Sequence, residues 1–313
     1  MAANAEEQRE DELYESEYPF IKNAQAIIRK MIELNLSSQN KKELLVDEIL
    51  HSIFFLGMIN APPFSPEDIF TDSEMLGALR LYYPLPFQHY SSQLPRRTPF
   101  SCVLDMIVFL EGRENEEEIK QKLQEIITEL HLKKMEPLVS STICVSQKNP
   151  NSEKYYGVSM STSGRDPGRI MVAASCLPGS WDSYVAGAVM TFNPKKRMRS
   201  YFDGTIKLPE PVTCKAYSLH GGGPVVPPCK SCRVVWFGRK DMNEFPYGNC
   251  AEVESVSNLF KNDKEVREQA RPTSEKVTTK NRSKAEKSVR EDLRNLLKTF
   301  KLPCDYHFYI PSE

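Results

Sequence analysis

Hydrophobic residues follow two different spacings along the chain, and the change lies near residue 135. Before it, apolar residues recur every three or four positions along 24–34, 41–59, 101–112 and 114–134. This spacing places them on one face of a helix. We therefore predict a helical N-terminal region over residues 1–135, built from two pairs of helices.

Two proline-rich segments connect these pairs. They cover residues 61–70 and 82–100 and contain aromatic residues among the prolines. Proline is unfavourable inside a helix because it lacks the N–H group and clashes with the preceding turn. We expect an ordered, non-helical connection here, packed through its aromatic side chains.

Short β-rich runs follow residue 136. They span 137–147, 154–163, 169–177 and 184–192, and Gly, Pro, Asn and Asp interrupt them. Such runs predict strands, and the turn residues within 161–170 predict a hairpin connection. A long loop over 218–232 precedes a helix that contains residues 253–260.

The end of the chain is dominated by charged residues. The stretch 261–292 carries almost no apolar side chains, so we expect a charged, flexible or loosely helical insertion. A final helix over 292–300 and a strand over 304–310 complete the pattern. The predicted fold is α+β (or α/β): the helical region, then a mixed sheet flanked by helices over residues 136–313.

Composition indicates an intracellular chain. The formal net charge is −1, no run of eighteen apolar residues occurs, and the N-terminal segment is acidic where a signal peptide would be basic and then apolar. We expect a cytoplasmic, or alternatively nuclear, protein without membrane contact. In a reducing compartment its eight cysteines are thiols or metal ligands rather than disulfides.

Three of these cysteines have the spacing of a metal site. The sequence PPCKSC carries Cys229 and Cys232, and seventeen residues separate Cys232 from Cys250. A hydrolytic zinc site has three protein ligands and one open position, whereas a structural site has four. Three cysteines without an obvious fourth ligand therefore favour an open Zn²⁺ site.

Glu252 is the candidate catalytic residue. It lies two positions after Cys250, at the start of a predicted helix, where the helix dipole favours the thiolate form of Cys250. A carboxylate beside a hydrolytic zinc can accept a proton from water and pass it to a leaving amine. His220, in the LHGGGP loop, and Asn249, directly before Cys250, are candidate substrate-binding residues.

The segments PPCKSCRVV and GNCAEVESVSNLF resemble the P-C-x-x-C and [HC]-A-E motifs of the zinc-dependent cytidine-deaminase-like superfamily. The CAE form is similar to that of free-nucleoside cytidine deaminases and some toxin-type deaminases. The resemblance implies a cytidine-deaminase-like fold for residues 136–313, with zinc on the three cysteines and proton transfer by Glu252. In the family the [HC]-A-E motif usually comes first, whereas here it comes second. Because a metal requires geometry rather than chain order, a permuted fold could form the same site.

The predicted function is zinc-dependent hydrolytic deamination of a cytosine- or adenine-type base in a nucleoside, a nucleotide or a single-stranded nucleic acid. The basic residues at 195–199, beside Tyr201 and Phe202, either contact phosphates and a base or form a solvated turn. Trp236 and Phe237 are expected in the core.

Other interpretations of the cysteines remain open. The zinc site could be structural and closed by His220 or Cys214, in a scaffold that binds a protein partner through its N-terminal helices. The cysteines could also bind no metal at all. Cys229 and Cys232 could also be a redox pair, because C-x-x-C suits thiol exchange.

Overall fold

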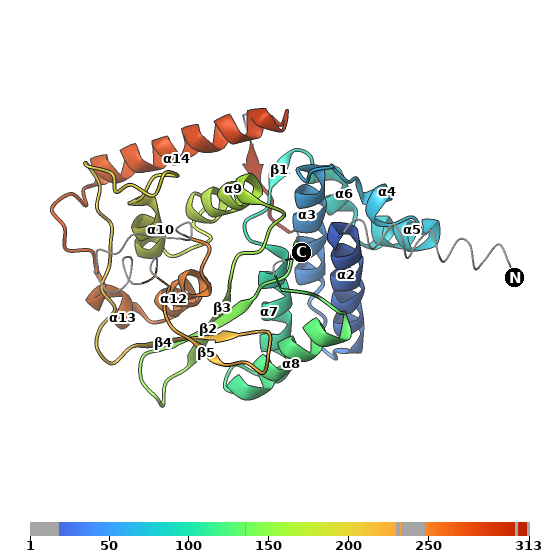
Figure 1. Cartoon of the computed structure of the whole chain (residues 1–313), viewed down its shortest axis with the longest axis horizontal. Coiled ribbons are helices and arrows are strands. Elements are labelled where there is room, and N and C mark those ends of the chain that lie inside the picture. Colours follow the sequence, from blue (N-terminus) through green and yellow to red (C-terminus); the bar gives the residue numbers. More distant parts are fainter. Residues whose placement is uncertain (1–18, 135, 230–231, 233–247, 304–305, 312–313) are drawn as a thin grey trace, which may run out of the picture.

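The computed structural model describes residues 19–134, 136–229, 232, 248–303 and 306–311. It is a mixed α+β fold, as the sequence predicts. Figure 1 shows the N-terminal helices on one side of a small sheet and the later helices on the other. Among the described helices, none is long and apolar enough to span a lipid bilayer.

The N-terminal region is helical, as the spacing of apolar residues predicts. Its elements are α2 (Pro19–Ser37), α3 (Glu43–Met58), α4 (Pro66–Ile69), α5 (Ser73–Tyr82), α6 (Pro84–His89), β1 (Gln93–Leu94), α7 (Pro99–Glu111) and α8 (Glu116–Glu129). The expectation that prolines exclude helix from 61–70 and 82–100 is wrong. The first turn of a helix contains Pro66 in α4, Pro84 in α6 and Pro99 in α7. Proline is tolerated there because the N–H groups of the first turn make no hydrogen bond within the helix.

The sheet forms where the β-rich runs at 137–147 and 154–163 predict it. Its strands β2 (Thr142–Gln147), β3 (Lys154–Val158), β4 (Thr213–Ser218) and β5 (Val225–Val226) are all antiparallel, in the order β3-β2-β4-β5. Both faces are covered. Ile143 and Val145 belong to the large core shared with the N-terminal helices, whereas Cys144 on the opposite face contacts Ala251.

Two predicted strands are helices instead. The runs 169–177 and 184–192 lie in α9 (Arg165–Cys176) and α10 (Ser183–Met190), and the predicted hairpin at 161–170 leads into α9. Continuous apolar runs do not distinguish a buried strand from a buried helix. The decisive local feature of α10 is Asp182, whose side chain accepts a hydrogen bond from the N–H of Tyr184 at 2.8 Å and caps the helix.

The charged stretch at 261–292, expected to be flexible or loosely helical, is mostly helical, with a non-helical connection over 270–278. It contains the end of α12 (Ala251–Asn262), α13 (Lys264–Gln269) and most of α14 (Thr279–Thr299). Ala285 and Leu293 are buried on one face of α14, so few apolar residues suffice when they share a face. The predicted C-terminal strand is confirmed as β6 (His307–Phe308), which pairs in parallel with β1.

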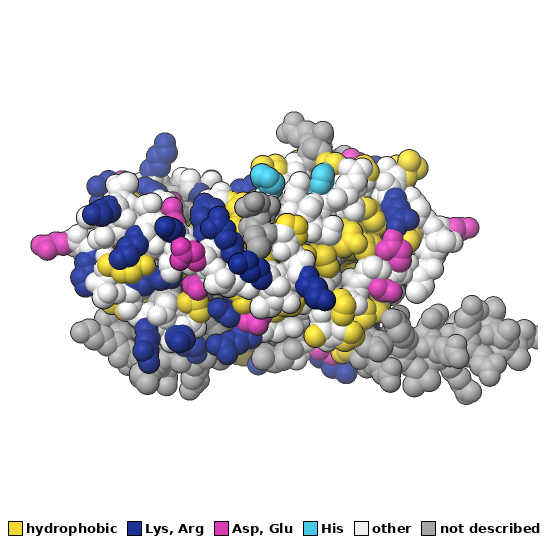
Figure 2. Space-filling model, turned by 90° about the horizontal axis from the view of Figure 1, so that it is seen from above, with side chains coloured by type: hydrophobic (Ala, Val, Ile, Leu, Met, Phe, Trp, Pro, Cys, Tyr) yellow, Lys and Arg dark blue, Asp and Glu magenta, His cyan; other side chains and the backbone are white. Residues whose placement is uncertain are grey.

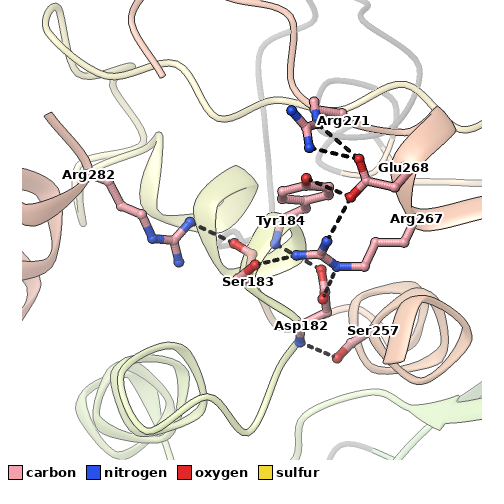
Figure 3. Close-up of polar contacts among 8 residues, drawn as sticks. All are labelled: Asp182, Ser183, Tyr184, Ser257, Arg267, Glu268, Arg271 and Arg282. Atoms are coloured by element: carbon pink, nitrogen blue, oxygen red, sulfur yellow. Dashed lines mark hydrogen bonds and ion pairs between the residues drawn. The ribbon is translucent and has the colours of Figure 1, made fainter. Parts of the chain in front are cut away.

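A polar network fixes α12 and α13 against α10 (Figure 3). The Arg267 guanidinium donates to Asp182 and to the hydroxyl of Ser183, each at 2.7 Å, and lies 3.8 Å from the ring centre of Tyr184. The N–H of Asp182 donates to the Ser257 hydroxyl at 2.8 Å. Because Asp182 is almost fully buried, this pairing restrains the position of α12.

Candidate metal centre

Cys229, Cys232 and Cys250 converge in the folded chain. Their Sγ atoms all lie within 4.8 Å of one another, and those of Cys229 and Cys250 are 3.2 Å apart. The Cys232 N–H donates to the Cys229 sulfur at 3.5 Å. Among the described residues, these cysteines are the only His, Cys, Asp or Glu group that converges in this way, and the cluster can bind a metal ion.

The spacing and the donor chemistry fit a thiolate-binding metal ion, of which tetrahedral zinc is one. A tetrahedral ion with Zn–S bonds of about 2.3 Å separates its sulfur ligands by about 3.8 Å. The observed sulfur separations, 3.2 Å for one pair and no more than 4.8 Å for any pair, bracket that value. Thiolates are soft ligands that select zinc, copper(I) or iron–sulfur clusters over magnesium or calcium.

The start of α12 presents Cys250 to the other two thiols. Cys250 is the residue before the helix, with extended backbone angles (φ −83°, ψ 147°), and its side chain makes no capping hydrogen bond. Its sulfur is instead directed to Cys229. The free N–H groups of the first helical turn carry a partial positive charge, which stabilises a thiolate at this position.

Gly157 allows α12 to lie directly on the sheet. A Cβ atom at this position in β3 would come within 2.3 Å of the Ser255 nitrogen and 2.6 Å of the Ala251 oxygen. The Ser255 hydroxyl then bonds to the Ser146 hydroxyl at 2.7 Å and the Tyr155 carbonyl at 2.8 Å. The strand and the helix are therefore held in close backbone contact immediately beside Cys250 and Glu252.

Glu252 lies at the cluster without belonging to the converging set. Its side chain is buried, and its carboxyl accepts a hydrogen bond from the Cys232 thiol. Burial raises the pKa of Glu252 above the usual range, and the hydrogen bonds to its carboxylate only partly oppose this. Glu252 is thus close to the Cys232 sulfur, but its carboxylate is not one of the converging metal ligands.

The surroundings of Cys232 and Cys250 favour the protonated form of these two thiols. Hydrogen bonds with Cys229 and Cys250, followed by burial, keep the pKa of Cys232 well above its usual range. The bond with Cys229 is the largest cause of the raised pKa of Cys250. A divalent cation reverses this preference because it stabilises the thiolates directly.

The two alternative fourth ligands are elsewhere. His220 lies beside Thr128 and His131 in a separate surface pocket next to α8. Cys214 is paired with Cys144 on adjacent strands, with 3.3 Å between their sulfur atoms. Neither joins the three-cysteine group in the described part of the chain. His220 therefore does not lie with the other predicted site residues.

Asn249 lies between the cluster and a large cavity. Its carbonyl accepts a hydrogen bond from the Met160 N–H at 2.9 Å, and it lines a cavity of about 760 Å³ between α9 and α14. Arg165 and Arg169, which also line this cavity, were not among the predicted site residues. Their spacing of four along one helix was the available signal, but the segment was predicted as a turn and a strand.

The basic stretch at 195–199 is divided by the fold. Lys196 and Arg199 line the same cavity, whereas Lys195 and Arg197 are exposed. Phe202 is fully buried in the core, so it cannot stack on a base. Trp236 and Phe237 lie outside the described residues.

Comparisons with protein families, with curated proteins and with solved structures find no match to this chain. The likeness to the cytidine-deaminase-like superfamily therefore rests on the two short motifs. The structure adds that their three cysteines and Glu252 lie together despite the reversed order.

Proposed function

We propose that the protein is a zinc-dependent hydrolytic deaminase acting on a cytosine- or adenine-type base. The observation that carries this proposal is the position of Glu252. It touches Cys232 at a cluster of three thiols that has no fourth His, Cys, Asp or Glu ligand within the described residues. Three protein ligands with a free carboxylate nearby are the arrangement of a hydrolytic rather than a closed structural zinc.

Each residue has a defined part in this reaction. Cys229, Cys232 and Cys250 hold the ion, which supplies a Lewis acid with one open coordination position when bound. Glu252 takes a proton from the attacking water on a carboxyl oxygen and returns it to the departing amino nitrogen. Water and the amine thus give the carbonyl product and ammonia. Asn249 lies at the wall of the cavity in which the base would sit.

The experiment combines metal content with turnover. Zinc stoichiometry is measured on the wild-type protein and on Cys229→Ala, Cys250→Ala and Glu252→Gln variants, and ammonia release is assayed on nucleosides, nucleotides and single-stranded oligonucleotides. We expect one zinc per chain, lost with either cysteine and kept in Glu252→Gln. Ammonia release should fall at least 100-fold in Glu252→Gln, because general acid–base catalysis contributes about 10²–10⁴-fold.

Zinc-free wild-type protein after purification under reducing conditions would refute the metal assignment. Ammonia release that Glu252→Gln leaves intact would refute the role of the carboxylate. Since the ligands must remain thiols or thiolates, we place the protein in a reducing compartment, the cytoplasm or the nucleus.

A structural zinc in a partner-binding scaffold is the second candidate function. Two observations favour it: Cys232 is only 1% exposed, and Leu81 and Tyr82 on α5 are each 75% exposed. Exposed apolar side chains of this size are typical of binding surfaces. In this case zinc would be bound without ammonia release, and Leu81→Ser with Tyr82→Ser would abolish partner binding while leaving zinc in place.

A further inference from the structure

The cavity beside Asn249 is enclosed by elements far apart in the sequence. Its walls come from α9, α14, the segment after β3 and the loop that follows α10, and its volume of about 760 Å³ lies within the range of small-molecule sites. Asn249 places one wall directly next to Cys250. Among the described residues that line the cavity, Asn249 is the one next to the cysteine cluster in sequence, and neither the three cysteines nor Glu252 is among them.

Positive charge predominates in this cavity. Two acidic residues, Glu136 and Asp292, line it, together with four basic ones: Arg165, Arg169, Lys196 and Arg199. Figure 2 shows Lys and Arg side chains gathered over the part of the molecule where α14 runs, and the exposed residues of α14 include Lys280, Lys284 and Lys287. The cavity and the surface above it therefore attract anions.

Two of the guanidinium groups have donors without acceptors. Arg199 donates to the Met190 carbonyl at 3.0 Å and to the Ser288 hydroxyl at 2.8 Å, yet its buried Nη2 has no partner among the described residues. Arg169 donates from Nη1 to Asp166 at 3.0 Å, and its buried Nε likewise has no partner in the described part of the chain. Asp292 makes no ion pair with either arginine among the described residues.

Buried unpaired donors on a charged group are unfavourable, and a ligand oxygen would relieve this. A guanidinium presents its N–H groups in a planar fork that matches two oxygens of a phosphate. Hydrogen bonds hold both side chains in place: Arg169 donates to Asp166, and Arg199 donates to Ser288 and the Met190 carbonyl. The remaining N–H donors are therefore oriented before a ligand binds.

From these contacts we infer that the cavity binds the phosphate group of a small phosphate monoester, with Arg169 and Arg199 as its donors. The identification of this monoester as the substrate, a nucleoside monophosphate rather than a free nucleoside, rests on the proposed deaminase function. The phosphate site itself does not depend on that function.

The test is equilibrium binding by calorimetry at 0.15 M salt. The full-length Glu252→Gln protein, which cannot turn substrate over, is titrated with cytidine 5′-monophosphate, adenosine 5′-monophosphate, the two nucleosides and inorganic phosphate. The same titrations are repeated with two double variants, in which the Glu252→Gln protein also carries either Arg169→Gln or, as a matched control, Arg197→Gln. Arg197 carries the same charge but is exposed and lies outside the cavity.

We expect at least one monophosphate to bind ten or more times more tightly than its nucleoside. Arg169→Gln should weaken this binding by about 10- to 100-fold, as expected when a hydrogen bond to a charged group is lost. Arg197→Gln should change it less than threefold. Binding of inorganic phosphate that depends on Arg169 would also support the site, even if wild-type protein releases no ammonia and the deaminase proposal fails.

Three results would overturn the inference. One is that neither monophosphate nor inorganic phosphate binds. Another is an equal loss in Arg169→Gln and Arg197→Gln, which would indicate a general surface field. The third is tighter Arg169-dependent binding of an eight-nucleotide single strand than of either monophosphate, which would make the ligand a nucleic acid instead.

Discussion

His51 is a buried histidine that contacts the returning C-terminal segment. Its ring stacks on Tyr309 with 3.7 Å between ring centres, and within the described residues its Nδ1 has no hydrogen-bond partner. Burial, as the main cause, lowers the pKa of His51 to about 3. The native protein therefore keeps this side chain neutral in a pH range where the unfolded chain protonates it.

This histidine makes the fold sensitive to acid. Below a pH of about 6.5 the unfolded state binds a proton that the native state does not, so stability falls as the pH falls. The predicted loss is about 1.4 kcal/mol per pH unit across this window, down to the native pKa of about 3. Urea unfolding of the wild type and of His51→Phe between pH 7 and pH 4 measures it.

The variant should show a flatter dependence on pH, because phenylalanine has no proton to gain. Asp47 accepts a hydrogen bond from Tyr309, and burial raises its pKa. This carboxyl therefore acts in the opposite direction, with stability gained as the pH falls. Since both proteins retain Asp47, its effect largely cancels in the comparison, and equal slopes would contradict the role given to His51.

At the scale of elements, the contact of β3 with α12 determines the geometry of the metal centre. Gly157→Ala would place a methyl group 2.3 Å from the Ser255 nitrogen, a backbone atom that cannot rotate away. The helix must then shift from the sheet and carry Cys250 and Glu252 with it. We predict a loss of about 2–3 kcal/mol in unfolding free energy, as for an overpacked core, together with a lower zinc content.

Gly77→Ala is the matched control for this substitution. Gly77 lies within α5, and apart from its chain neighbours and the backbone of its own helix, no described atom is within 4 Å of the position of its missing Cβ. Alanine there should raise stability by up to about 1 kcal/mol and leave the zinc content unchanged. If both variants keep full zinc occupancy, the β3–α12 contact does not position the site.

The elements also show what the sequence could and could not predict. Helices α2, α3, α7 and α8 follow from their apolar spacing. The approach of Cys250 to the C-x-x-C pair follows from the chemistry of metal-binding cysteines, and Glu252 comes with Cys250 because it lies two residues further along the chain. The helices α9 and α10 do not follow from their apolar spacing, because small and apolar residues in a continuous run fit either a buried strand or a buried helix. Only the neighbouring elements decide between them.

The same limit applies to the cavity and to α14. The cavity is formed by α9, α14 and the loop near Arg199, which are separated by up to about 100 residues. The pattern of residues within each segment therefore does not predict that these segments come into contact. The charged stretch was expected to be flexible or loosely helical because its apolar residues are few. Ala285 and Leu293 nevertheless bury one stripe of α14, and burial of a face rather than average composition determines whether a helix is stable.

At the scale of the whole molecule, the change of pattern near residue 135 does not interrupt the core. The largest hydrophobic cluster joins Ile53 and Phe100 of the N-terminal helices to Val145 and Tyr156 of the sheet and to Leu293 of α14. The pairing of β6 with β1 returns the C-terminal segment to the N-terminal helices. The part before residue 135 and the part after it thus each cover apolar surface that the other part alone would expose to water.

We therefore expect one cooperative unfolding transition for the whole chain. Both tryptophans, Trp181 and Trp236, follow residue 135, so their fluorescence reports on the later part, whereas far-ultraviolet circular dichroism includes the N-terminal helices. In urea the two signals should give the same midpoint, because neither part retains a complete core without the other. Expressed alone, residues 1–135 should lack the dispersed amide resonances of a packed protein. Separate midpoints, or a well-dispersed spectrum from that fragment, would establish two independently folding domains instead.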